Sequence, residues 1–198
     1  MAIFASSAVR LLIGLTVALT FIAFFTPTGY IPDAALSFRM PAALKKLDVS
    51  ITQEEKYPVL IRATVRNNND EPVTILSYGS PLDPLGISLG ILYITPKGDS
   101  KPLDIMQIEA SRLWPPADDA LIEILPGRAA IWEFTLQEPV VPMDKVFEGA
   151  TVQLKGTWNA VWTKEKKNVD YTSFEEGTPA NETLTGPFKS NIIDIEVV

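Results

Sequence analysis

The 198-residue sequence contains neither histidine nor cysteine. Histidine is the usual general base at neutral pH, and the cysteine thiolate is a common nucleophile. Both residues also supply the nitrogen and sulfur ligands of most zinc sites, and without cysteine no disulfide framework can form. The composition therefore favours binding over catalysis, and we predict no catalytic, cofactor-binding or metal-ligating residues.

Basic residues are scarce: 17 lysines and arginines stand against 24 aspartates and glutamates, so the formal net charge is −7. Nucleic-acid binding needs clustered positive charge to neutralise phosphates, which this balance disfavours. The basic run at residues 164–167 contains Glu165 and is interpreted as a solvated loop. We therefore predict a protein partner rather than a nucleic acid.

Long apolar runs are also few, and the main one covers only residues 11–25, after the single charge of Arg10. A positive charge followed by about 7–15 apolar residues is typical of a secretory signal peptide, whereas a spanning helix needs about 20. No small-x-small cleavage site follows the run. A cleaved signal peptide and an uncleaved signal anchor, which would contact the membrane through residues 11–25, therefore both remain open, beside a buried core helix.

A second mark of the secretory pathway is the triplet Asn181-Glu182-Thr183, which is an N-glycosylation sequon in a polar segment. Asn181 is the predicted acceptor. Together with the apolar N-terminus, it predicts a secreted or membrane-anchored protein whose remaining chain is lumenal or extracellular.

The rest of the chain predicts an all-β domain. Residues 26–45 contain prolines and lack a stable period, so they are interpreted as a linker. From Leu47 onward apolar and polar residues alternate, as in half-buried strands. About seven to nine such strands at regular spacing predict an immunoglobulin-like antiparallel β-sandwich over residues 46–198, preceded by an N-terminal apolar helix.

Some elements can be placed more closely. We expect strands at residues 87–94 and 103–108, and a strand pair formed by residues 120–125 and 129–136 around Pro126-Gly127. Trp132, Trp158 and Trp162 follow the period of their strands and are assigned to the core. Residues 164–189 are interpreted as a polar excursion before a final strand at residues 190–198.

Several short motifs follow one another in a distinctive order. They are Leu47-Asp48-Val49-Ser50-Ile51-Thr52, Ile61-Arg62-Ala63-Thr64-Val65-Arg66-Asn67, Ile75-Leu76-Ser77-Tyr78-Gly79-Ser80-Pro81-Leu82-Asp83, Leu125-Pro126-Gly127 before Trp132-Glu133-Phe134, and the closing segment from Ser190-Asn191 to Val197. This succession resembles the N-terminal propeptide-type domain of the fungal deuterolysin metalloproteases over most of residues 46–198.

The resemblance implies a freestanding relative of a domain that precedes a zinc protease, assists its folding and holds it inactive. The protease of that family needs a His-Glu-x-x-His helix, so none of its catalytic residues can be carried over to a chain without histidine. What the resemblance adds is a candidate partner, namely a secreted protease.

Two irregular loops are the candidate contact surfaces, because loops on a rigid sandwich commonly carry binding. One contains Trp114 and Pro115, and the other follows Tyr78 and contains Leu82 and Asp83. Adjacent carboxylate pairs such as Glu54-Glu55 point to opposite faces of a strand and are interpreted as solvated charge.

The first hypothesis is a non-enzymatic secreted or lumenal binding module that resembles a protease propeptide and acts as inhibitor, chaperone or adaptor. The second is a membrane-tethered accessory or catalytic protein of a fungal secretory or biosynthetic pathway. The third is a secreted effector or structural protein.

Overall fold

The computed structural model describes residues 40–170 and 182–197. In this part of the chain the regular structure is almost entirely β-strand. The elements are α3 (Ala42–Lys45), β1 (Leu47–Lys56), β2 (Val59–Asn67), β3 (Val73–Leu76), β4 (Leu92–Pro96), η1 (Asp118–Ala120), β5 (Leu121–Ile124), β6 (Ala129–Leu136), η2 (Met143–Lys145), β7 (Ala150–Trp162), η3 (Lys166–Asn168), β8 (Leu184–Lys189) and β9 (Ile193–Ile195).

The first sheet has the order β1–β2–β6, and both neighbouring pairs are antiparallel. Along β2 every second residue is buried while the residues between them are half-buried or exposed. This is the alternation expected of a strand with one face towards a core. The buried residues of β2 are Val59, Ile61, Ala63, Val65 and Asn67.

The second sheet is built around β7, the longest strand, with which β3, β4, β8 and β9 all pair antiparallel. Val152 lies between Ile94 of β4 and Ile193 of β9. Further along β7, Val161 has partners in both β3 and β8. β5 extends this sheet by pairing with β3.

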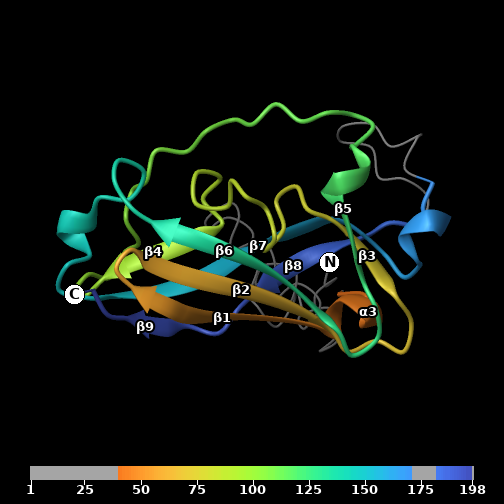
Figure 1. Cartoon of the computed structure of the whole chain (residues 1–198), viewed down its shortest axis with the longest axis horizontal. Coiled ribbons are helices and arrows are strands. Elements are labelled where there is room, and N and C mark those ends of the chain that lie inside the picture. Colours follow the sequence, from red (N-terminus) through yellow and green to blue (C-terminus); the bar gives the residue numbers. More distant parts are fainter. Residues whose placement is uncertain (1–39, 171–181, 198) are drawn as a thin grey trace, which may run out of the picture. The chain divides into compact units, whose positions relative to one another are not determined.

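The two sheets form two layers, with β1, β2 and β6 drawn in front of β7 and β8 (Figure 1). Apolar side chains from both sheets meet in one cluster between them, and the largest fully buried one is Trp158 of β7. The predicted all-β antiparallel sandwich is thereby confirmed. The assignment of Trp158 and Trp162 to the core is confirmed as well.

A smaller apolar cluster lies near the C-terminal end of β7. Trp162 is its largest buried side chain, and Tyr78 and Trp114 pack against it while remaining partly exposed. The cluster therefore supports Tyr78 and Trp114, two of the residues predicted to contact a partner. Its buried members are Leu76, Ala120, Leu121, Ala160, Trp162 and Val169.

The predicted strand pair around Pro126-Gly127 is wrong, although both strands exist. β5 pairs with β3 in the second sheet, and β6 pairs with β2 in the first. The Gly127 N–H donates to the Asn67 carbonyl (2.8 Å), and the Asn67 N–H donates to the Arg128 carbonyl (2.9 Å). These bonds fasten the turn to the end of β2, so the chain crosses between sheets instead of folding back.

The structure also differs from several other predictions made from the sequence. Trp132 is 38% exposed rather than buried, because β6 is an edge strand of its sheet. Residues 87–90 form turns, with Gly90 at a φ of +70° that favours glycine, and β4 begins only at Leu92. Residues 103–108 form no strand. Within the predicted polar excursion, residues 184–189 are strand β8, paired with β7.

Some predictions lie outside the described residues. These are the N-terminal apolar helix with residues 11–25, most of the linker at residues 26–45, and the acceptor Asn181. Of the predicted linker, residues 42–45 form the short helix α3. None of the helices in the described part of the chain has the length and apolar character needed to cross a membrane.

Candidate functional site

The two predicted contact loops lie next to each other, and their polar centre is Asp83. The Asp83 carboxylate is fully buried and accepts three hydrogen bonds. The Gly79 and Leu85 N–H groups donate to it at 2.6 and 2.9 Å, and Arg112 Nη2 donates at 2.6 Å. A buried charge is tolerated only when it is paired and hydrogen-bonded. The ion pair therefore ties the loop after β3 to the segment before η1.

Aromatic side chains pack next to this ion pair. The Arg112 guanidinium lies over the Tyr78 ring, 4.6 Å from its centroid. Tyr78 in turn meets Trp114 edge-to-face, with ring centroids 5.8 Å apart and planes at 80°. Such cation–π and edge-to-face contacts are both favourable electrostatically. Arg112, Tyr78 and Trp114 thus pack in one continuous cluster.

The opposite side of the site is formed by strands of the second sheet. Lys155 of β7 lies over the ring of Tyr93 from β4, 4.7 Å from its centroid. Asn159 of β7 donates from Nδ2 to the Tyr78 carbonyl at 2.9 Å. Between these walls is a cavity of about 410 Å³, which we call the aromatic groove. Its lining includes Tyr78, Tyr93, Arg112, Trp114, Lys155 and Asn159.

The close approach of backbone to β7 requires glycine at residue 79. Gly79 has a φ of +71°, a conformation that side chains with a Cβ rarely adopt. A Cβ built there would lie 2.7 Å from Asn159 Nδ2. Gly79 thus allows both the turn that presents its N–H to Asp83 and the contact between this loop and β7.

The structure brings Tyr78 and Asp83 together with Trp114, which the sequence places in the other loop. Leu82 and Asp83 were expected to touch a partner, but both side chains are buried, so neither is available for direct contact. Leu82 instead belongs to the main core, and Asp83 positions Arg112. Pro115 is exposed beside Trp114.

Sequence reasoning missed Arg112, Tyr93, Lys155 and Asn159 as members of the site. Tyr93 and Lys155 did carry a signal, because strand alternation turns both side chains away from the core that Leu92, Ile94 and Leu154 enter. No sequence pattern indicates Arg112, since its partner Asp83 is 29 residues away in the sequence.

Chemically, the groove offers aromatic faces, an exposed ammonium group and amide donors. These groups suit contacts with aromatic, acidic or peptide groups of another molecule. Among residues 40–170 and 182–197 no three carboxylates converge in a way that would hold a metal ion.

Comparison with known proteins places the chain in a family. A family model described as an immunoglobulin-like domain matches residues 46–197. The chain belongs to this immunoglobulin-like family. The predicted immunoglobulin-like character of the sandwich is thereby confirmed.

A relative of this immunoglobulin-like chain occurs in Arthroderma benhamiae. That protein is described as an uncharacterized secreted protein and is 32% identical over 146 residues, which cover 71% of this chain and 70% of the relative. Its description names a compartment but no activity.

Proposed function

We propose that this immunoglobulin-like chain is a secreted, non-enzymatic module that binds another protein through the aromatic groove. The secreted relative and the apolar residues 11–25 support the compartment. The residue types of the groove support the binding role, because tyrosine, tryptophan and arginine are the side chains enriched at the energetic centres of protein interfaces.

The observation that carries the proposal is the Asp83–Arg112 ion pair, in which Asp83 is buried and Arg112 lies over the ring of Tyr78, which in turn packs edge-to-face with Trp114. The ion pair holds Arg112 against the Tyr78 ring in the free protein. Binding then costs less side-chain entropy, which is the general advantage of a preorganised surface.

A finer proposal concerns the partner. The succession of motifs that resembles a deuterolysin propeptide falls on β1, β2, β3 and the loop that contains Asp83, then on the β5–β6 turn, β6 and the segment with β9. On this ground we propose an inhibitor, chaperone or adaptor role towards a secreted protease. Mixing the protein with secreted fungal metalloproteases tests the inhibitor version, and unchanged protease activity at micromolar concentrations would reject it.

The groove itself is tested by retention of proteins from fungal culture filtrate on the immobilised full chain. Tyr93→Ala removes a 37% exposed ring from the groove, whereas Tyr57→Ala removes an 84% exposed ring from the β1–β2 turn and serves as the matched control. We expect Tyr93→Ala to weaken retention about tenfold or more, equivalent to about 1.4 kcal/mol, and Tyr57→Ala to leave it unchanged. Equal retention by both variants would contradict the role of the groove.

A further inference from the structure

Residues 103–113 cross the surface as a single drawn-out segment, which we call the strap. In Figure 1 the strap is the green trace that arches away from the strands before η1. It is anchored at its start, where the Leu103 N–H donates to the Ile94 carbonyl (2.8 Å), and midway, where the Ile108 N–H donates to the Ser88 carbonyl (3.0 Å). The Arg112–Asp83 ion pair anchors its end.

Between these anchors most backbone groups of the strap have no main-chain partner in the described part of the chain. Residues 104–107 and 109–111 make no main-chain hydrogen bond with any part of the chain that the structure describes. Backbone N–H and C=O groups that are unpaired along an extended segment are a template for pairing with a strand of another chain. The strap therefore offers main-chain hydrogen bonds that the fold itself does not use.

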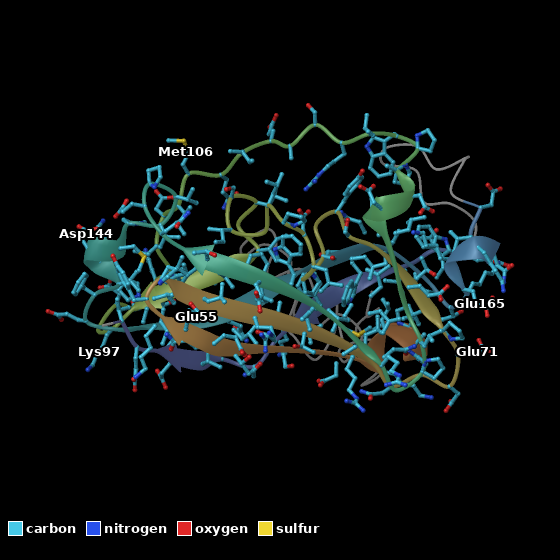
Figure 2. All side chains as sticks on the ribbon, viewed as in Figure 1. Glu55, Glu71, Lys97, Met106, Asp144 and Glu165 are labelled. Atoms are coloured by element: carbon cyan, nitrogen blue, oxygen red, sulfur yellow. The ribbon has the colours of Figure 1, made fainter. Side chains whose placement is uncertain are left out.

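The side chains of the strap divide between the body and the solvent. Leu103 and Ile105 pack against the main core, whereas Met106 is 86% exposed and points away from the body (Figure 2). Ile108 and Leu113 are exposed too. Three large exposed apolar side chains within one short segment favour an interaction site over a simple connection.

The charge of the strap indicates the chemistry of the partner. Asp104 and Glu109 are exposed, and neither has a basic partner among the ion pairs of the described residues. A second copy of this chain is a poor occupant, because pairing two straps would bring these carboxylates together between molecules of net charge −7. A surface with basic side chains would instead complement them.

We propose that the strap is taken up as an added strand by a protein partner whose receiving cleft is apolar and flanked by basic side chains. This inference rests on the proposed function, and it names the segment and the mode of binding. Main-chain hydrogen bonds would supply affinity, and pockets for Met106 and Ile108 would supply selectivity. The three anchors keep the strap extended in the free protein, which lowers the entropy lost on binding.

The test again uses immobilised full chain and fungal culture filtrate. Met106→Asp places a charge at the outermost apolar position, and Ile192→Asp does the same at a 63% exposed position after β8. Unchanged thermal unfolding of both variants verifies that each folds. We expect Met106→Asp to lower retention about tenfold or more and Ile192→Asp to leave it intact. Hydrogen exchange of the wild-type chain, with and without the retained fraction, should slow at residues 104–111.

The outcomes separate the two proposals. Retention that survives Met106→Asp, or slowed exchange that excludes residues 104–111, overturns the strap as the docking segment and leaves a binding function in place. A wild-type chain that retains nothing from the filtrate overturns the binding function, and the strap inference with it.

Discussion

Asp83 is the residue whose surroundings say most about how this surface is made. Its carboxylate is inside the protein, and two main-chain N–H groups together with Arg112 satisfy it. Removing one partner from such a network leaves a buried charge without full compensation, and that loss exceeds the net contribution of the intact pair. The exposed Lys46–Asp70 pair has no such penalty, because water replaces either partner.

Two separate substitutions, each of which removes one cation, test this contrast. Arg112→Ala should lower the free energy of unfolding by about 3 kcal/mol, because Asp83 stays buried without its counter-ion. Lys46→Ala should lower it by about 0.5 kcal/mol, because its ion pair with Asp70 is exposed. Urea unfolding followed by circular dichroism measures both. Equal losses would show that the Asp83 network contributes no more than a surface pair.

Glu196 provides a test of electrostatics by pH. A hydrogen bond from Lys56, and then the charge of that ammonium group, lower the pKa of Glu196 below its ordinary value of 4.5. A lowered pKa means that the folded state favours the carboxylate. This small stabilisation is present above the unfolded value and is lost as the pH falls through the folded pKa. A carboxyl NMR titration should find a lower midpoint for Glu196 in the wild type than in Lys56→Ala; identical midpoints would contradict the pairing.

Among the elements, β1 is an edge strand, and a side chain from a distant part of the sequence forms hydrogen bonds with its free edge. Asn191 accepts the Ile51 N–H through Oδ1 (2.8 Å) and donates from Nδ2 to the Ile51 carbonyl (3.1 Å). The side-chain amide thus takes the place of a peptide group in a neighbouring strand. Gln53 makes comparable bonds to the main chain of Glu196. Edge strands that lack such cover are prone to pair with other chains.

Substitution of Asn191 should reopen this edge. Asn191→Ala removes both hydrogen bonds, at about 1 kcal/mol each, and should speed hydrogen exchange at the Ile51 amide. Asn191→Asp keeps the acceptor for that amide but sets a second carboxylate oxygen against the Ile51 carbonyl, so exchange at Ile51 should lie between that of the wild type and that of Asn191→Ala. The amide exchange rates can be read by NMR, and unchanged exchange in the alanine variant would show that another group covers the edge.

For the whole molecule, the decisive feature is that both sheets share one core. Trp158 lies at its centre and is 1% exposed, whereas Trp132 on the edge strand β6 is 38% exposed. Since the main core draws side chains from β1, β2 and β6 as well as from β3, β4 and β7, loss of the central ring weakens both layers together. We therefore expect a single cooperative unfolding transition for the described domain.

The two tryptophans form a matched pair for this prediction. Trp158→Ala should cost about 3–5 kcal/mol because it leaves a large cavity, and Trp132→Ala about 1 kcal/mol because its ring is already partly in water. Circular dichroism during urea unfolding gives both values. Similar costs for the two, or two separate transitions, would contradict a single shared core.

The amino-acid sequence alone predicts the alternation of β1 and β2, the all-β class and the core role of Trp158 and Trp162. These features depend on local periodicity, which requires only that one face of each strand be buried. The sequence also predicts two candidate contact loops, the one that contains Trp114 and the one that follows Tyr78.

The tertiary structure alone decided which segments pair and which loops meet. β5 and β6 are neighbours in sequence yet enter different sheets, because hydrogen bonds from a distant residue, Asn67, fasten the turn between them. Likewise Arg112 reaches Asp83 from 29 positions away, and the open strap exists because its two ends are anchored to separate parts of the fold. Contacts between residues so far apart depend on how the chain packs as a whole, and periodicity along the sequence does not predict them.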